Sequence, residues 1–267
     1  MPIAHANGID IYYERAGEGE PLLFISGSHG DLRVRPNHFD TPLANAFELV
    51  GYDQRGLGQT TNPPGEFTMR DYADDAAALL DHLDLDTVPV VGVSFGGMVG
   101  QEFALRHPGR VSRLVLACTS SGGAGGKSYP LHELAGLPAR KRAEAQIKVA
   151  DLRYDDAWIE ENPQRWEVLV ERTMGTRRGD RDEKGAAKQL SARWDHDVYE
   201  RLPSLNMPVL LAAGRYDGIA PVANMEAIQA QIRGSEIEYF EGGHMFLAQD
   251  KSAYPFIAEW LCSGSGA

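Results

Sequence analysis

Short runs of apolar residues alternate along this chain with stretches in which apolar residues recur at helical spacing. Between two such runs, the apolar positions from Tyr72 to Leu83 predict a helix, and Thr68 followed by Asp71 matches a helix start. Strands that alternate with helices favour an α/β fold with a parallel sheet. The continuous runs are typical of strands buried on both faces, and they occupy Pro21–Ile25, Phe47–Tyr52, Thr87–Gly92, Arg113–Ala117 and Met207–Gly214.

Both ends of the chain extend this sheet. Near the N-terminus, Asn7-Gly8 separates Ile3–His5 from Ile9–Glu14, which is the pattern of a hairpin with a type I′ turn. Glu236–Phe240 is the last predicted strand, and Ser252–Leu261 is the closing helix. We therefore predict a mostly parallel, eight-stranded sheet flanked by helices.

A long interruption of the strand pattern follows the run that ends at Ala117. It begins with the glycine-rich Thr119–Gly126, and only helical periodicity follows, over 138–152, 155–174 and 182–202. One crossover between parallel strands needs about a dozen residues, so this length favours a helical cap over ordinary crossover helices. We expect a core of residues 1–120 and 206–262, a cap of residues 121–205 and a flexible tail of residues 263–267.

Composition narrows the range of functions. The chain has 267 residues, with Lys+Arg 26 against Asp+Glu 38, so its net charge is −12. Nucleic-acid binding needs a basic surface, and we exclude a nucleic-acid partner. The N-terminus lacks a basic region followed by an apolar core, and no apolar run approaches a membrane span. We expect a cytoplasmic protein without a membrane partner, and a homo-oligomer stays open.

The two cysteines, Cys118 and Cys262, form neither a disulfide framework nor a metal-ligand spacing. Cys118 ends an apolar run, so we expect a buried free thiol there. We expect no metal site.

The segment Gly92-Val93-Ser94-Phe95-Gly96 stands between a predicted strand and a predicted helix over 97–106. In so tight a turn, side chains at 92 and 96 would collide with the neighbouring strand and helix, so both positions need glycine. The helix start behind Ser94 offers free N–H groups and a positive dipole end to a developing oxyanion. A glycine-rich turn without chemistry is the alternative, but this context favours a catalytic serine.

A serine hydroxyl needs a base, and the base needs an orienting acid. Asp217 follows the predicted strand over 208–213, and His244 follows the one over 236–240. The carboxyl ends of parallel strands meet at one edge of a sheet. We therefore expect Ser94, Asp217 and His244 to converge there as a catalytic triad.

Each of these residues also has a simpler explanation. Asp217 alone could cap a turn before Pro221, and His244 alone could be a surface histidine. Their joint order, each just past a predicted strand, favours the triad. Of the seven other histidines only His29 also follows a predicted strand, but it precedes the serine.

An oxyanion hole needs two backbone N–H groups. We expect one from Phe95, directly after the nucleophile, and one from Ser28 in the loop after Ile25. Ser28 could instead only shape its turn.

From Pro21 to about Gly122 and again from Pro208 to Leu261, the chain resembles a capped, single-domain α/β-hydrolase. That group includes carboxylesterases, enol-lactonases, carbon–carbon bond hydrolases and cofactor-free haloperoxidases. Members commonly have His-Gly where this chain has Ser26-Gly27. The serine at 94 weakens the resemblance to haloalkane dehalogenases and epoxide hydrolases, which use an aspartate nucleophile. The motifs that carry the resemblance are Asp53-x-Arg55-Gly56-x-Gly58, Gly92-x-Ser94-x-Gly96-Gly97, Gly214-x-x-Asp217 and Gly243-His244.

Other residues have two interpretations each. In this family Asp53 and Arg55 hold their loop together more often than they touch substrate. His29, Arg33 and Arg35 could bind a substrate carboxylate, although a solvated surface run is the simpler explanation. The apolar side chains of the insert could line a substrate pocket or simply pack, and they are Trp158, Trp166, Met174 and Trp194.

The sequence thus predicts a cofactor-independent serine esterase or lactonase with a small-molecule ester or lactone substrate. Its substrate pocket would include His29, Trp166 and Trp194. A carbon–carbon bond hydrolase or a cofactor-free haloperoxidase or perhydrolase on the same triad is the first alternative. A ligand receptor without turnover is the second.

Overall fold

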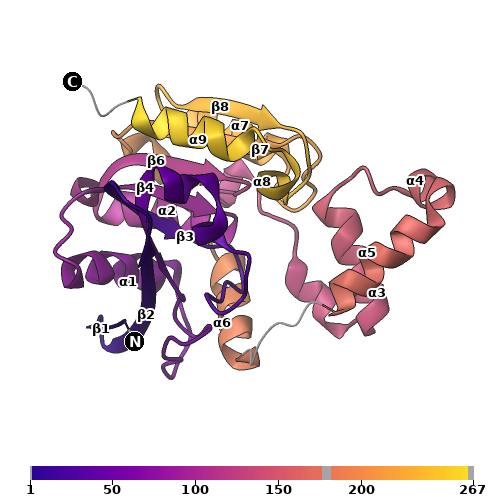
Figure 1. Cartoon of the computed structure of the whole chain (residues 1–267), viewed down its shortest axis with the longest axis horizontal. Helices are drawn as coiled ribbons and strands as arrows, with labels where there is room; N and C mark the ends of the chain where they lie inside the picture. The colour runs from indigo at the N-terminus through magenta and orange to yellow at the C-terminus, as the bar shows by residue number, and fades with distance from the viewer. Residues whose placement is uncertain (1, 176–181, 264–267) are drawn as a thin grey trace.

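The computed structural model describes residues 2–175 and 182–263. Within these residues one sheet of eight strands runs through the molecule in the order β1-β2-β4-β3-β5-β6-β7-β8 (Figure 1). The pairs β1–β2 and β2–β4 are antiparallel, and every other neighbouring pair is parallel. This confirms the predicted fold class. The strands are β1 Ile3–Ala6, β2 Ile9–Ala16, β3 Glu20–Ile25, β4 Phe47–Tyr52, β5 Val88–Val93, β6 Val111–Ala117, β7 Val209–Gly214 and β8 Glu236–Phe240.

The N-terminal hairpin forms as its turn sequence predicts. Asn7 and Gly8 have φ of 48° and 73°, and a type I′ turn requires positive φ at both central residues.

Side chains alternate between the two faces of the sheet, and each face has its own layer of helices. Leu23, Val90 and Leu114 face α1 Met69–His82, α2 Phe95–Arg106 and α7 Val222–Gln231. The neighbouring positions Leu22, Val91 and Val115 face α8 Phe246–Gln249 and α9 Ala253–Cys262. The strands are therefore buried on both sides, which is why they appear as continuous apolar runs.

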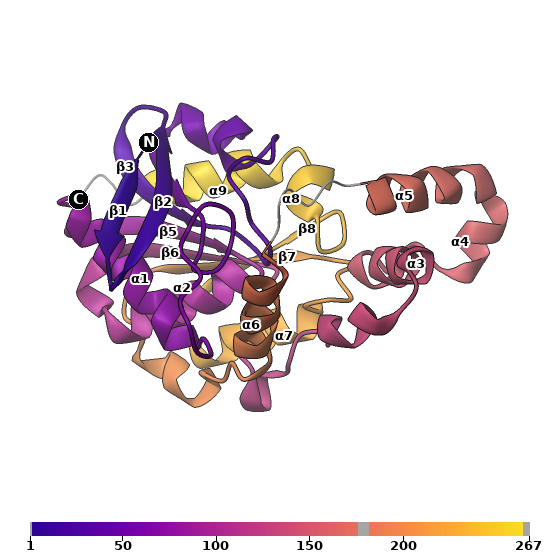
Figure 2. The ribbon, with the colours of Figure 1, turned by 90° about the horizontal axis from the view of Figure 1, so that it is seen from below.

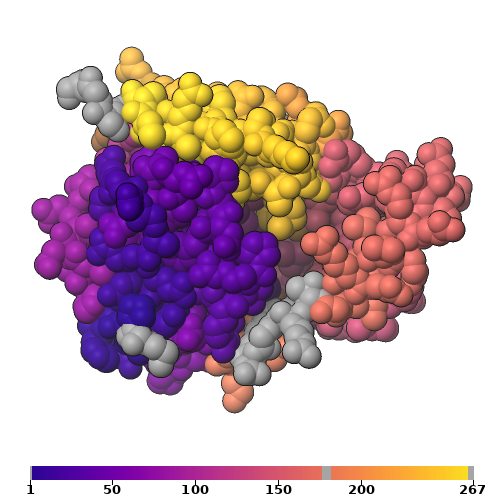
Figure 3. Space-filling model, in the orientation of Figure 1, coloured from indigo at the N-terminus to yellow at the C-terminus, as the bar shows by residue number. Residues whose placement is uncertain are grey.

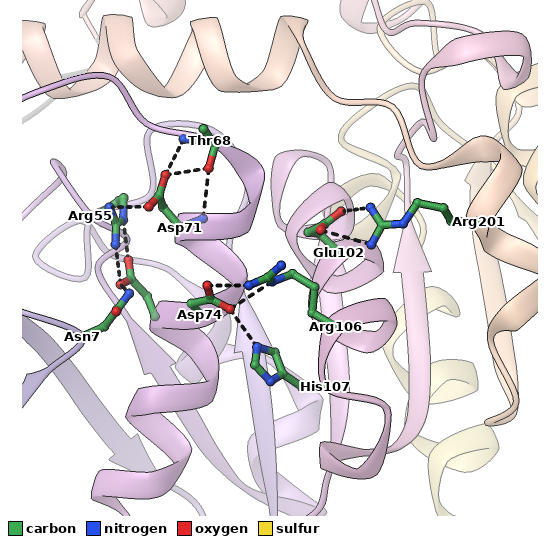
Figure 4. Close-up of polar contacts among 10 residues, drawn as sticks. Asn7, Arg55, Thr68, Asp71, Asp74, Glu102, Arg106, His107 and Arg201 are labelled. Atoms are coloured by element: carbon green, nitrogen blue, oxygen red, sulfur yellow. Dashed lines mark hydrogen bonds and ion pairs between the residues drawn. The ribbon is translucent and has the colours of Figure 1, made fainter.

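Polar contacts fasten the first helix layer (Figure 4). The hydroxyl of Thr68 accepts the N–H of Asp71, whose carboxylate accepts the N–H of Thr68, so a capping box starts α1. Asp74 on α1 binds Arg106 and His107 at the end of α2, with nitrogen–oxygen distances of 2.8 to 3.0 Å. These contacts join α1 to α2 on this face of the sheet.

The long interruption of the strand pattern is helical, in two parts that differ in position. The helices α3 Ala139–Ala150, α4 Asp156–Glu161 and α5 Pro163–Gly175 project from the body, and we call residues 139–175 the arm (Figure 2). In the space-filling view the arm forms a separate lobe (Figure 3). It has its own apolar cluster of Ala143, Ile147, Trp166 and Val170.

The second part is α6 Glu183–Trp194, which lies on the body rather than in the arm (Figure 2). Its Gly185 lies so close to Gly56 that a methyl group at 185 would overlap the Gly56 carbonyl. The boundaries between core and cap stay a prediction.

Some predicted elements differ from the observed ones. The helix predicted over 155–174 is divided, because α4 ends at Glu161 and Pro163, which has no N–H to donate, begins α5. The helix predicted over 182–202 ends at Trp194 and is followed by a 3₁₀ turn at Tyr199–Ser204.

At the C-terminus, residues 264–267 of the predicted tail lie outside the described residues. None of the helices in the described part of the chain is long and apolar enough to cross a membrane.

Candidate active site

Ser94 occupies the sharp turn between β5 and α2. Its φ of 55° and ψ of −114° are unusual for a residue with a side chain, and the structure holds it there at the start of α2. A methyl group on Gly96 would overlap the carbonyl oxygen of Ile25, and one on Gly92 would overlap the carbonyl of Gly96. The steric need for glycine at both positions is confirmed.

Ser94, His244 and Asp217 come together at the carboxyl edge of the sheet. The His244 Nε2 atom lies 2.9 Å from the Ser94 hydroxyl, and Nδ1 lies 2.8 Å from Oδ2 of Asp217. An ionised carboxylate only accepts, so Nδ1 carries the proton and Nε2 is left to accept from the serine. The three residues form the hydrogen-bonded chain that a nucleophilic serine needs.

Asp217 is buried, and both of its oxygens are engaged. Oδ1 accepts the N–H groups of Ile219 and Ala220 at 2.7 and 2.9 Å, while Oδ2 faces His244. The turn-capping role that could have explained Asp217 alone therefore exists, but it uses the other oxygen. These bonds fix the carboxylate that in turn orients the imidazole.

Cys118 lies directly behind these residues, at the end of β6. It is a buried free thiol, as expected. Burial raises the pKa of the thiol well above its ordinary value, so it remains protonated. Its sulfur, a carboxylate oxygen of Asp217 and a ring nitrogen of His244 lie within 4.8 Å of one another, the one such group of potential metal ligands in the described residues.

The two predicted oxyanion donors flank Ser94. Phe95 is the first residue of α2, so its N–H has no acceptor within the helix. The loop after β3 passes on the other side, where a methyl group on Gly27 would lie 3.5 Å from the Ser94 Cβ. Ser28 follows directly, with its hydroxyl buried. The donor roles of Phe95 and Ser28 stay predictions.

The loop after β4 holds the loop after β3 in place. We call this second loop, which contains Ser28, the oxyanion loop. Asp53 accepts the N–H of Leu32 at 2.7 Å, and the Gln54 side chain donates to the carbonyl of Ser26 at 2.7 Å. Burial raises the pKa of Asp53 to about 6. Arg55 makes two buried hydrogen bonds to Asp75, at 2.6 and 2.7 Å. The loop-holding interpretation of Asp53 and Arg55 is confirmed.

A cavity of about 520 Å³ opens beside the oxyanion loop. Ser28 and His29 line it, and so does Met245, which directly follows His244. Much of its remaining wall is apolar, with Leu32 and Val34. Ser28 and Met245 bring this cavity next to the Ser94–His244–Asp217 group, although none of those three residues lines it.

The other predicted substrate residues lie elsewhere. Trp166 packs in the apolar cluster of the arm, and Trp194 stands at the end of α6 with the Lys127 ammonium 4.2 Å from its ring centre. Arg33 pairs with Asp31, and Arg35 pairs with Glu14. A substrate-binding role for these side chains stays a prediction.

Two buried residues of α6 contact segments near the site, but no sequence motif marks them as doing so. The Gln189 side chain accepts the N–H of His29 at 2.9 Å and so holds the oxyanion loop from above. Arg193 donates to the carbonyl of Tyr129 at 2.9 Å, and burial lowers the pKa of its guanidinium to about 10. Their spacing of four residues places both on one helix face, but that signal requires knowing which face is buried.

Comparison with known proteins extends these observations. The family model of the alpha/beta hydrolase fold matches residues 20–251. A poly(3-hydroxyalkanoate) depolymerase of Ectopseudomonas oleovorans is 29% identical over 245 residues, covering 90% of this chain and 84% of the relative. The 3-oxoadipate enol-lactonase 2 of Acinetobacter baylyi is 25% identical over 267 residues, covering 97% of both.

A solved structure shows the same arrangement of elements. The enol-lactonase from Burkholderia xenovorans superposes with a TM-score of 0.76 at 21% identity, covering 98% of this chain and 100% of that one. At this identity the likeness concerns the fold, which both chains share along their whole length.

Proposed function

This chain belongs to the α/β-hydrolase fold family, and from that premise we propose that it cleaves carboxylic esters or lactones through an acyl-enzyme on Ser94. The observation that carries the proposal is the hydrogen-bonded chain from the Ser94 hydroxyl through His244 to Asp217, with distances of 2.9 and 2.8 Å. These two hydrogen bonds turn the weakly nucleophilic Ser94 hydroxyl into a reactive one, because an acceptor for its proton is already in place.

In the first half of the reaction, the Ser94 oxygen attacks the substrate carbonyl and its proton passes to Nε2 of His244. Asp217 stabilises the imidazolium and fixes the tautomer in which Nε2 is free to accept. The N–H groups of Phe95 and Ser28 receive the negative charge on the former carbonyl oxygen. When the tetrahedral intermediate collapses, His244 returns the proton to the leaving alcohol.

In the second half, a water molecule donates its proton to Nε2 of His244 and attacks the ester carbonyl on Ser94. The same groups stabilise the second oxyanion, and the acid is released with Ser94 restored. For a lactone, the alcohol and the acid leave as one hydroxy acid. These steps need no cofactor.

The cavity beside Ser28 and Met245 is the proposed substrate pocket. Its volume of about 520 Å³ lies in the range of small-molecule sites. Leu32 and Val34 favour an apolar acyl group. The enol-lactonase among the relatives acts on a cyclic ester, which supports a lactone as one class of substrate.

The proposal is tested by turnover of nitrophenyl esters of graded acyl length and of simple lactones. Replacing Ser94 by Ala removes the nucleophile, and we expect kcat to fall by about 10⁴-fold or more. Ser252→Ala, an exposed serine at the start of α9, is the matched control and should keep wild-type activity. A fluorophosphonate should add one covalent group to the wild type, with the mass located on Ser94.

Equal turnover by the wild type and Ser94→Ala would contradict the proposal. Turnover only of diketone acids, or only of acetate with peroxide, would replace it by the carbon–carbon hydrolase or perhydrolase alternative. Stoichiometric binding without turnover would point to a receptor.

A further inference from the structure

One short segment of the insert contacts both loops that carry the acid and the base of the triad. It is Val149–Arg153, the end of α3 and the residues after it, and we call it the strap. The carbonyls of residues 149 and 150 accept the N–H groups of Gly218 and His244 at 3.1 and 2.6 Å, and the N–H of residue 152 donates to the Tyr216 carbonyl at 2.9 Å. The neighbours of Asp217 and the backbone of His244 thus rest on the same five residues.

A side-chain bridge adds to these backbone contacts. Oδ2 of Asp151 accepts the Gln249 side-chain amide at 3.0 Å, and the Gln249 carbonyl oxygen accepts the N–H of Gly243 at 2.8 Å. Gln249 ends α8, the short helix that follows His244. The bridge therefore joins Gly243, directly before His244, to Gln249 at the end of α8, and it anchors both to the strap.

The fit between strap and loop leaves no space for a side chain. A methyl group on Gly243 would overlap the carbonyl of Ala150 and approach Asp151, and one on Gly218 would lie 2.6 Å from the carbonyl of Val149. A shift of the strap is therefore transmitted to the loops directly.

The charge of Asp151 is balanced within the strap itself. Arg153 binds both of its oxygens, at 2.9 and 2.6 Å, and lies 4.7 Å from the centre of the Tyr216 ring. Burial alone would raise the pKa of Asp151, but the bonds from Arg153 and Gln249 outweigh it and hold the pKa below its ordinary value. Asp151 is thus an ionised acceptor, which gives the bridge a charge-assisted hydrogen bond.

We propose that Asp151 is a positioning residue for the reaction, and that it acts through Gln249 to hold His244 at hydrogen-bonding distance from both Ser94 and Asp217. This inference rests on the proposed serine-hydrolase function. Proton transfer requires heavy atoms within about 3.2 Å, and a misplacement of about 1 Å can cost about 100-fold in rate. A loop released at Gly243 lets the imidazole leave that range without any loss of the catalytic groups themselves.

Two variants test the bridge from opposite ends. Asp151→Asn keeps the size of the side chain but places an amide where Gln249 and Arg153 both donate, and Gln249→Ala removes the bridge while Asp151 stays paired with Arg153. We expect both to lower kcat by about tenfold or more, with KM changed less than about twofold, because ground-state binding does not use the bridge. Lys148→Ala, on α3 and paired with the arm residue Asp156, should keep wild-type kcat.

A second readout does not depend on turnover. The Nδ1 proton of His244, held between the ring and Asp217, is expected to give a low-field proton signal in wild-type NMR spectra, and ¹⁵N-histidine labelling with His244→Gln assigns it. We expect the signal to weaken or disappear in Asp151→Asn and Gln249→Ala and to persist in Lys148→Ala.

The outcomes separate the two proposals. Wild-type kcat with an intact low-field signal in folded Gln249→Ala would overturn the positioning role, and so would a change in KM alone. If wild type and Ser94→Ala are equally inactive, the hydrolase proposal fails, and the NMR signal still decides whether Asp151 and Gln249 position the histidine.

Discussion

The two sides of the proposed catalytic centre are built in opposite ways. On the nucleophile side, a strand, a turn and a helix within residues 88–106 fix Ser94, and the glycines that permit the turn are its neighbours in the sequence. On the acid–base side, the loops that carry Asp217 and His244 are held by residues 149–153 of the insert, far away in the sequence. The nucleophile is therefore specified locally, whereas the acid and base depend on a segment that also supports the arm.

The largest effect should come from the nucleophile side, where the start of α2 lies directly against the backbone of residues 25 and 26. In Gly96→Ala the new methyl group meets the carbonyls of Ile25 and Ser26, which belong to β3 and the oxyanion loop. We expect a loss of about 3 kcal/mol or more in the free energy of unfolding and more than about 100-fold in kcat/KM. Urea unfolding and ester hydrolysis measure both quantities.

The matched control lies four residues along the same helix. A methyl group on Gly100 would lie 3.5 Å from a methyl of Leu114, an ordinary contact. Gly100→Ala should change the free energy of unfolding by less than about 1 kcal/mol, because alanine also favours the helix. Near-wild-type behaviour of Gly96→Ala would show that the turn at Ser94 tolerates a side chain and that local packing does not determine the turn.

A smaller effect is expected on the other side, from Gly243→Ala. Gly243 has no positive φ that would require glycine, so the overlap with Ala150 and Asp151 of the strap is what opposes the new methyl group. The atoms it meets belong to the end of α3 and the residue after it rather than to a strand of the sheet, so we expect about 1–2 kcal/mol of destabilisation with a loss of about 10- to 100-fold in kcat. A stability loss equal to that of Gly96→Ala would contradict the idea that this side is the more adjustable one.

The same contrast explains what the sequence could predict. The turn at Ser94 was predictable because its requirements, two glycines between a strand and a helix, are all local. Asp217 and His244 were predictable because each follows a strand, and strand ends gather at one edge.

The parts that were not predictable depend on partners far away in the sequence. Asp151 is an ordinary acid after a helix and Gln249 an ordinary amide at the end of one, and only the structure shows that they meet. Gln189 and Arg193 likewise gain their roles from the way α6 lies on the body. The division of the helix predicted over 155–174 was readable from Pro163, but the direction in which the arm projects was not.

The least direct effect on the site concerns pH, because two histidines outside the Ser94–His244–Asp217 group are buried. His38 stacks on Phe24 of β3 on the nucleophile side, and His196 follows α6, where its carbonyl lies against Gly122 at the start of the insert. Burial lowers the pKa of each to about 3, from an ordinary value of 6.5. The folded protein thus resists protonation that the unfolded chain accepts, so stability is fully present above pH 6.5 and is lost as the pH falls from 6.5 towards 3.

Each histidine should therefore cost up to about 2 kcal/mol of unfolding free energy between pH 7 and pH 5. His38→Gln and His196→Gln remove the titration, and urea unfolding at the two pH values should show a smaller acid loss in each variant than in the wild type. Because His38 is buried against Phe24, its replacement should alter the pH dependence of unfolding, and because it also lines the proposed substrate cavity, KM is measured beside it. His196 stands where the insert leaves the body, so its replacement should also shift the pH at which activity declines. If the two variants behave alike in both measurements, the insert and the core respond to acid as one unit. The two sides of the site would then differ in how they are built but not in how acid destabilises them.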